Sequence, residues 1–254
     1  MPSSPPAVSP LSGDAKRSYV RQMFTAIAPR YDLLNHVLSL NVDRGWRRRA
    51  VDRLTWRKRS RSPLRGTYLD LCAGTLDLAL VLAGRPGFGG RVIGADFVVP
   101  MLKLGRKKSG DGAVVDAVGA DALELPFRDA RFDGCVVGFG IRNLADLDRG
   151  LDEMRRVLKP GGRLVILDFG IPRGWPVRSV YLFYFLRVLP RIGRLVSKHT
   201  SAYSYLPDSV SEFPSPERLA ERVARAGFAN VGFERLTLGV AVLLWGDVPE
   251  GPSR

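Results

Sequence analysis

Short apolar runs alternate along this chain with stretches whose apolar residues recur at helical spacing. Runs rich in Val, Ile and Leu and bounded by glycine or acidic residues are typical of strands buried in a parallel sheet. We expect such strands at residues 67–72, 91–96, 113–118, 132–139 and 163–169. We expect helices between them at residues 76–83, 100–108 and 146–157. This alternation predicts an α/β fold with a mostly parallel sheet that helices cover on both faces.

The C-terminal part of the chain follows a different order. A helical pattern at residues 215–226 precedes two apolar runs, 231–238 and 240–245, which meet at Gly239. We expect these runs to pair as a hairpin, because a short connection that contains glycine joins antiparallel strands. The hairpin would place an antiparallel strand at one edge of the sheet. A further tight turn is predicted at residues 159–162, KPGG.

Polar and small residues follow the predicted strands. In an open parallel sheet, ligands bind beyond the carboxyl ends of the strands, at the point where the strand order switches. The residues expected at this edge are 70–75, Asp96, Asp121, 138–143 and Asp168. The candidate binding site is therefore assembled from loops that lie far apart in the sequence.

The loop after the first predicted strand, CAGTLD at residues 72–77, limits the choice of cofactor. It lacks the G-x-G-x-x-G pattern, whose glycines let backbone N–H groups reach a pyrophosphate. Asp77 would also place a negative charge beside the helix start. S-adenosylmethionine has no phosphate, and a loop with one glycine and flanking carboxylates suits its amino group, ribose and sulfonium.

We therefore expect S-adenosylmethionine as the cofactor. Asp96 is placed to accept hydrogen bonds from the ribose hydroxyls, and Asp121 and Ala122 are expected to border the adenine. The complete set of cofactor-binding candidates is Asp70, Gly74, Thr75, Asp96, Asp121, Ala122 and Gly138. The alternative for Asp70 and Asp96 is that each only caps a loop, although the ordered series of strand ends favours a binding role.

Composition excludes several classes of protein. The chain has 254 residues, 45% of them hydrophobic, and its two cysteines form neither a disulfide framework nor a zinc spacing. Residues 1–14 are expected to be a disordered tail, because this Pro- and Ser-rich start lacks the apolar segment of a signal peptide. No apolar run approaches the roughly 18 residues of a membrane span, so we expect a cytoplasmic protein.

The net charge of +14 is concentrated partly in residues 44–65, which carry ten Lys and Arg residues against one acidic residue, Asp52. Such a stretch indicates an anionic partner, either nucleic acid or acidic lipid. The alternative is a solvated, arginine-rich helix face without a partner. Charge alone does not decide between them.

Four longer motifs resemble those of one family. They are FTAIAPRYDLLNHVLSLNVDRGWRRRAV at residues 24–51, ADALELPFRDARFD at 120–133, GFGIRNLADLDRGLDEMRRVLKPGGRLVILDF at 138–169 and LPRIGRLVSKHTSAYSYLPDSV at 189–210. Over about residues 19–245, the chain resembles the UbiE/MenG-type quinone C-methyltransferases, which belong to the class I methyltransferases. It departs from the family pattern at Leu76, where glycine is usual, at Gly138, where Ser is frequent, and at Asp168, where Glu is common.

The resemblance implies a Rossmann-like class I methyltransferase fold with a seven-stranded sheet. It implies a single domain at residues 15–254, with an N-terminal helical lid at 15–65 and a substrate or lid insertion at 170–212. The implied reaction methylates a ring carbon of a polyprenylated quinol and needs no metal. Demethylmenaquinol is the favoured substrate, and the benzoquinol of ubiquinone biosynthesis is the alternative.

Arg142 and Asn143 are the candidate catalytic residues. The ring carbon becomes nucleophilic when the adjacent hydroxyl ionises, which costs roughly 4 kcal/mol at pH 7 for a phenol of pKa near 10. Arg142 would stabilise the quinolate, with Asn143 orienting Arg142 or a water molecule. The alternative is a turn in which Asn143 caps the next helix.

The remaining substrate and lid candidates are Tyr31, Asp32, Asn35 and His199. An ordinary polar helix face is the alternative for the first three, and a structural role for the lone histidine.

Residues 175–196 are apolar, aromatic and basic at once. They form either a lid that docks on an anionic membrane surface, where a lipid-soluble quinol resides, or a helix buried against the sheet. Nucleic acid is not the expected partner, because the chain shows no recognisable RNA-binding appendage. A homodimer stays open, as do an RNA methyltransferase, a methyltransferase of a soluble secondary metabolite and a non-catalytic protein of the same fold.

Overall fold

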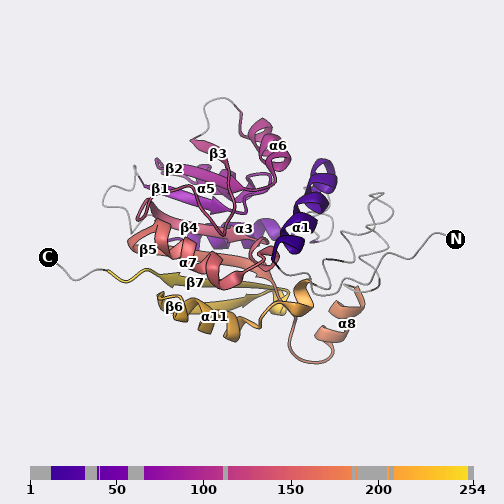
Figure 1. Ribbon diagram of the computed structural model, residues 1–254. Coiled ribbons are helices and arrows are strands. Elements are labelled where there is room, and N and C mark those ends of the chain that lie inside the picture. The colour runs from indigo at the N-terminus through magenta and orange to yellow at the C-terminus, as the bar shows by residue number, and fades with distance from the viewer. Residues whose placement is uncertain are drawn as a thin grey trace.

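The computed structural model describes residues 13–31, 39, 41–56, 66–110, 114–184, 187, 205 and 209–250. In this part of the chain, seven strands form one sheet in the order β3-β2-β1-β4-β5-β7-β6 (Figure 1). The strands are β1 (Thr67–Leu71), β2 (Arg91–Asp96), β3 (Val115–Gly119), β4 (Phe132–Gly138), β5 (Leu158–Phe169), β6 (Ala229–Leu236) and β7 (Ala241–Asp247). Strands β1 to β5 pair in parallel, and β7 runs antiparallel to both β5 and β6.

Helices cover both faces of this sheet (Figure 1). On one face, α7 (Leu147–Val157) and α11 (Pro216–Arg225) bury apolar side chains such as Met154 and Val223. On the other face, α3 (Asp43–Arg53), α5 (Asp77–Ala83) and α6 (Val99–Ser109) bury side chains such as Trp46 and Leu78. The other described helices are α1 (Gly13–Ile27), α8 (Val177–Phe183) and the short 3-10 helices η1 (Ala28–Arg30), η2 (Ile141–Asn143) and η4 (Thr237–Gly239). The fold class expected from the sequence is confirmed.

Local signals explain where two of the helices begin. The side chains of Asp146 and Ser215 accept backbone hydrogen bonds as the N-caps of α7 and α11. The alternative in which Asn143 caps the helix after β4 is therefore wrong. Residues 159–162, for which a tight turn was predicted, form an irregular part of β5. The register between β4 and β5 shifts there, and Gly161 adopts a left-handed conformation with φ 75°.

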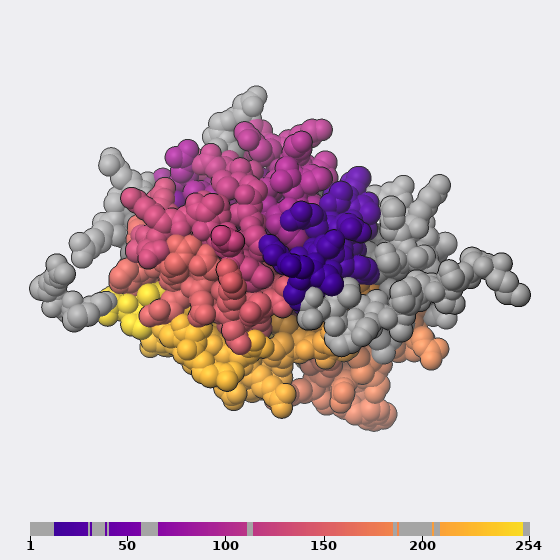
Figure 2. Space-filling model, in the orientation of Figure 1, coloured from indigo at the N-terminus to yellow at the C-terminus, as the bar shows by residue number. Residues whose placement is uncertain are grey.

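Two helices lie beyond the carboxyl ends of the parallel strands (Figure 1). α1 crosses this end of the sheet on the surface, whereas α8 projects from the lower part of the molecule (Figure 2). None of the residues of α8 is buried, so the alternative of a helix buried against the sheet is wrong for residues 177–183. In the described part of the chain, no helix is long and apolar enough to cross a bilayer.

Candidate functional site

The carboxyl ends of β1, β2 and β4 border a cavity at the point where the strand order switches between β1 and β4. Its wall contains five of the predicted cofactor-binding residues, Gly74, Asp96, Asp121, Ala122 and Gly138. α1 adds Arg17, Val20 and Phe24 from the opposite side. We call this space the cofactor cavity.

Asp96 fixes the loop after β1. Its carboxylate accepts hydrogen bonds from the backbone N–H of Val98 at 2.7 Å and of Gly74 at 2.8 Å. Burial raises the pKa of Asp96, and these hydrogen bonds oppose the rise. Gly74 has φ 53°, and a Cβ there would come within 3.2 Å of Met101 Cε across the cavity wall. The carboxylate keeps acceptor capacity beyond these backbone bonds for a ribose hydroxyl, so this donor and acceptor set fits S-adenosylmethionine.

Asp70 and Thr75 lie behind this loop and are not part of the cavity wall. Asp70 is buried, and its carboxylate accepts a hydrogen bond from the backbone N–H of Ala79 at 2.8 Å in the first turn of α5. Burial raises the pKa of Asp70 to about 7. Asp70 therefore supports the start of α5, which agrees with the alternative that it caps a loop.

Leu76 stands where the family usually has glycine, and it adopts the left-handed conformation that glycine favours, with φ 65°. It precedes α5 instead of starting the helix, contrary to the prediction for residues 76–83. Its side chain is fully buried away from the cofactor cavity, between two glycines. A Cβ on Gly94 would lie 2.2 Å from Leu76 Cδ2, and one on Gly105 2.6 Å from Leu76 Cγ. The leucine thus fills core volume and leaves the cavity open.

The segment after β3 borders the other end of the cofactor cavity, with Ala120 to Leu123 in its wall. Asp121 forms an ion pair with Arg17 of α1 and accepts a hydrogen bond from the backbone N–H of Leu123 at 2.9 Å. The Arg17 contact ties α1 to the predicted adenine end of the cavity. No sequence pattern predicted this partner, because the two residues are 104 positions apart along the chain.

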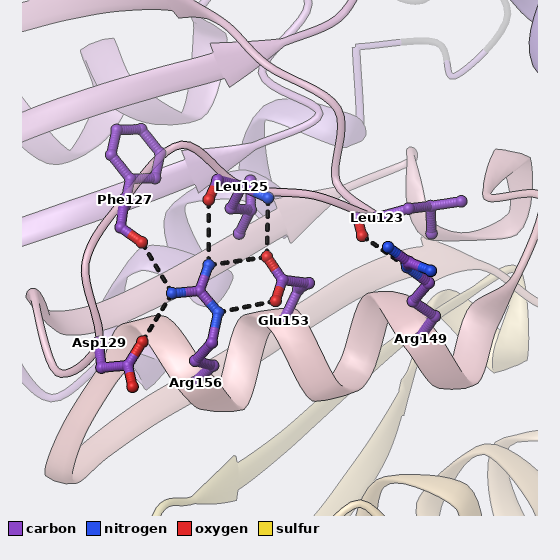
Figure 3. Close-up of polar contacts among 7 residues, drawn as sticks. All are labelled: Leu123, Leu125, Phe127, Asp129, Arg149, Glu153 and Arg156. Carbon is purple, nitrogen blue, oxygen red and sulfur yellow. Dashed lines mark hydrogen bonds and ion pairs between the residues drawn. The ribbon is translucent and has the colours of Figure 1, made fainter.

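Three side chains on one face of α7 hold the same segment (Figure 3). Arg149 donates to the carbonyl of Leu123 at 2.8 Å. Arg156 donates to the carbonyls of Leu125 and Phe127 at 3.0 and 2.8 Å, and to Asp129 at 2.7 Å. Glu153 accepts from the backbone N–H of Leu125 at 2.7 Å and pairs with Arg156. We call Arg149, Glu153 and Arg156 the α7 clamp.

Arg142 is buried after β4 and turns away from the cofactor cavity. Its Nη1 donates to Asp168 Oδ1 at 2.7 Å and to the carbonyl of Phe139 at 2.6 Å. In the described part of the chain, Arg142 Nε and Asp168 Oδ2 are buried and have no hydrogen-bond partner. Asn143 lines the cofactor cavity, and its Oδ1 accepts a hydrogen bond from the Tyr205 hydroxyl at 3.1 Å. The two candidate catalytic residues therefore lie on different sides of one turn.

Tyr31 lines the cofactor cavity, with its ring centroid 5.8 Å from that of Phe24. Lys16 of α1 donates to the carbonyls of Arg142 at 3.1 Å and Leu144 at 2.8 Å, which fastens α1 to the turn after β4. Neither this lysine nor Arg17 was expected from the sequence. The candidates Asp32, Asn35 and His199 lie outside the described residues.

The architecture is shared with solved methyltransferases. A SAM-dependent methyltransferase from Thermotoga maritima aligns with a TM-score of 0.61 at 20% identity, covering 89% of this chain and 98% of that one. The strand order, the helices on both faces and the cavity at the switch point define the class I methyltransferase fold.

The chain belongs to the ubiE/COQ5 methyltransferase family, whose family model matches residues 12–247. It is 50% identical over 228 residues to a demethylmenaquinone methyltransferase of Thermus thermophilus, covering 89% of this chain and 100% of the relative. It is 44% identical over 235 residues to a ubiquinone/menaquinone biosynthesis C-methyltransferase UbiE of Geotalea daltonii, covering 91% and 97%. The family and the methyltransferase class expected from the sequence are confirmed.

Proposed function

We propose that this chain transfers the methyl group of S-adenosylmethionine to a ring carbon of demethylmenaquinol, in menaquinone biosynthesis. The name of the Thermus relative supports this substrate. The observation that carries the proposal is the buried Arg142–Asp168 ion pair beside the cofactor cavity, which keeps an unused N–H donor. Benzoquinol methylation is the second candidate, supported by the name of the Geotalea relative.

Arg142 meets the main chemical requirement of this reaction. Once the adjacent hydroxyl has lost its proton to solvent, the ring carbon attacks the sulfonium methyl, and the methyl–sulfur bond breaks to leave S-adenosylhomocysteine. The methylated carbon then loses its own proton to solvent, which restores the aromatic ring. A fixed cation lowers the cost of the initial ionisation. The free Nε–H of Arg142 would bind the quinolate oxygen, while its Nη1 stays on Asp168 and Phe139. Asn143, held by Tyr205 on the cofactor side of the turn, would orient the ring against the methyl group.

The cofactor roles follow from the cavity wall. Asp96 would accept the ribose hydroxyls, Asp121 and Ala122 would border the adenine, and Gly74 and Gly138 would leave room for the methionine part. Asp70 and Thr75 would act through the loop that they support. Holding methyl and ring carbon in line contributes roughly 7–11 kcal/mol to such a transfer.

Peripheral attachment to an anionic membrane surface, on the cytoplasmic side, is part of the proposal. An apolar rim of exposed side chains supports it: Trp175 at 85%, Leu238 at 72%, Val180 at 68% and Phe183 at 64% exposure. The two segments of this rim adjoin, since a Cβ on Gly239 would lie 3.3 Å from Pro172 Cα. Exposed arginines such as Arg178 flank the rim and would add electrostatic attraction of about 1 kcal/mol each.

Part of the basic stretch at residues 44–65 forms ion pairs within the protein, although Arg44 and Arg48 are exposed. Arg47 pairs with Asp43 at 3.2 Å, and Arg49 and Arg53 pair with Glu234 at 2.8 and 3.2 Å. These charges are used within the protein. They hold α3 against the sheet instead of facing a phosphate backbone.

The test is methyl transfer from labelled S-adenosylmethionine in detergent, with reduced demethylmenaquinone, the benzoquinol analogue and bulk RNA as parallel acceptors. Label in the naphthoquinol is expected, and label only in RNA would refute the proposal.

Flotation with anionic vesicles tests the proposed attachment to a membrane surface. Trp175→Ser and Phe183→Ser should weaken vesicle binding, whereas the control Val114→Ser should not. Sedimentation of the purified chain tests for a homodimer.

A further inference from the structure

A second cavity, of about 160 Å³, lies beside Asp168 on the side of the sheet that α11 covers. We call it the β5–β7 cavity. Its walls are mostly apolar and come from β5, β7, α11 and residues 210–216, with Ile166, Val210, Phe213, Leu219, Val242 and Leu244 as the main contributors. A cavity of about 150 Å³ binds a benzene-sized molecule. The space therefore fits a group of about five or six carbon atoms.

Asp168 is the acidic residue of this wall. Its side chain is 2% exposed, and Oδ1 accepts from Arg142 at 2.7 Å and from the backbone N–H of Phe169 at 2.8 Å. Oδ2 has no partner among the described residues. A buried carboxylate oxygen is stabilised when a ligand donor reaches it. Because Arg173 and Arg235 line the cavity and Arg142 already pairs with Asp168, an uncharged hydroxyl fits better than a cationic group.

The methyl-accepting carbon lies outside the β5–β7 cavity. Phe139 lines the cofactor cavity and Phe169 lines the β5–β7 cavity, and their ring centroids are 4.7 Å apart. The two rings stand between the cavities. A group in the β5–β7 cavity therefore belongs to a part of the substrate a few bonds away from the reacting carbon.

A prenylated quinol has such a part. In demethylmenaquinol the reacting carbon is followed by the carbon that carries the prenyl tail and then by a carbon that carries a hydroxyl. We propose that the β5–β7 cavity binds this edge of the quinol: Asp168 Oδ2 accepts the hydrogen bond of the hydroxyl next to the tail, and the apolar walls hold the first isoprene unit. This inference rests on the proposed function and adds the orientation of the substrate.

The outer wall gives the rest of the tail a path. Ile171 and Arg173 line the β5–β7 cavity and precede Trp175 of the apolar rim by a few residues. A tail that leaves the cavity there reaches the rim and a lipid surface. The same orientation leaves the other hydroxyl, next to the reacting carbon, for Arg142 Nε.

The experiment compares reduced naphthoquinols that carry no tail, one isoprene unit or two units as acceptors for the full chain. Asp168→Asn keeps the shape and the hydrogen bond to Arg142 but removes the charge that faces the cavity, and Val242→Phe fills the cavity. Val240→Phe is the matched control, two residues earlier and outside the cavity wall. Calorimetry with S-adenosylmethionine accompanies each variant.

We expect Asp168→Asn to raise KM for the prenylated quinols about tenfold or more, the usual effect of losing a charged hydrogen bond. Val242→Phe should remove the preference for one isoprene unit over none, while Val240→Phe keeps it. The affinity for S-adenosylmethionine should stay within about twofold of wild type in all three variants, because the changed residues lie outside the cofactor cavity wall. If wild type methylates demethylmenaquinol but Val242→Phe keeps the wild-type tail preference, the subsite is refuted and the proposed function stands. The comparison of Val242→Phe with wild type tests the subsite even if Asp168→Asn fails to fold.

Discussion

On the cofactor side of the site, the carbonyls of Leu123, Leu125 and Phe127 accept hydrogen bonds from arginines of the α7 clamp (Figure 3). On the substrate side, the Arg142–Asp168 pair keeps a buried N–H and a buried oxygen without partners among the described residues. The cofactor side is thus complete without a ligand. On the substrate side, a bound ligand could satisfy these two groups.

The apolar surfaces differ in the same way. Val20 of α1, which closes the cofactor cavity, is buried, whereas α8 buries no residue and exposes Val180 and Phe183. A cofactor drawn from water needs a pre-formed cavity. If the substrate is the lipid-soluble quinol of the proposed function, it needs an apolar entrance, which a water-facing structure exposes at a cost. The difference indicates a fixed donor site beside an acceptor site that is completed on binding.

The variant Arg142→Met should have the largest effect, because it removes the cation of the substrate side. The variant should lose about 10²–10³ in kcat, the range for removing one group that stabilises a developing oxyanion. It should also lose about 3–5 kcal/mol of unfolding free energy, because Asp168 stays buried without its partner. The affinity for S-adenosylmethionine should hardly change, since Arg142 is not part of the cofactor cavity wall.

Turnover of labelled quinol, urea unfolding and calorimetry measure these three quantities. The double variant Arg142→Met with Asp168→Leu separates them. An apolar pair in place of a buried ion pair restores stability, so the double variant should be stable and inactive. A kcat within about threefold of wild type in Arg142→Met would mean that another cation binds the quinolate.

Asp70, which supports the loop of the cofactor side, should make the free energy of unfolding depend on pH. Burial raises its pKa to about 7 from the ordinary 3.8, against the opposing effects of Ala79 N–H and Arg47. Between these values the folded chain holds a proton that the unfolded chain has lost, so stability falls as pH rises and levels off above about pH 7. The expected loss between pH 5 and pH 8 is about 2–3 kcal/mol.

Asp70→Asn should flatten this dependence, because the amide oxygen still accepts from Ala79 N–H and carries no proton to lose. Urea unfolding at pH 5, 6, 7 and 8 measures it for both proteins. The variant should gain stability mainly at pH 8. An unchanged slope would place the titrating group elsewhere.

The periodicity of apolar residues predicted most strands and helices of the fold. It also predicted which residues form much of the cofactor cavity wall. Gly74, Asp96, Asp121 and Gly138 meet because each lies at or just after the carboxyl end of a parallel strand, which the apolar pattern predicts. The sequence also marked Asp168 as a strand end. It could not show which way that side chain points.

Side-chain direction is decided by packing between distant segments. Arg142 faces Asp168, 26 positions away, instead of the cofactor, and this follows from the contact of the turn after β4 with the end of β5. Leu76 is similar: its left-handed backbone suggests a need for glycine, but the space above Gly94 and Gly105 accommodates its side chain. No local pattern contains that space, because the two glycines belong to β2 and α6.

A smaller effect is predicted for the cofactor side, where Arg156 of the α7 clamp can be removed. Arg156→Met removes the hydrogen bonds to the carbonyls of Leu125 and Phe127 and loosens the segment that borders the cofactor cavity. Because this side chain is partly exposed, the loss of unfolding free energy should be only about 1 kcal/mol. The dissociation constant of S-adenosylmethionine should rise about tenfold. KM for the quinol should stay near the wild-type value, because the clamp contacts the cofactor side and not the substrate side.

Arg155→Met is the matched control, since Arg155 Nε donates to the carbonyl of Gly227 at 3.3 Å, away from that segment. It should leave cofactor affinity unchanged. Calorimetry with S-adenosylmethionine and initial rates over a range of quinol concentrations give both constants. If Arg156→Met raised the quinol KM as much as the cofactor dissociation constant, the two sides would be coupled through β4, and the pre-formed cofactor side would not be independent of the acceptor.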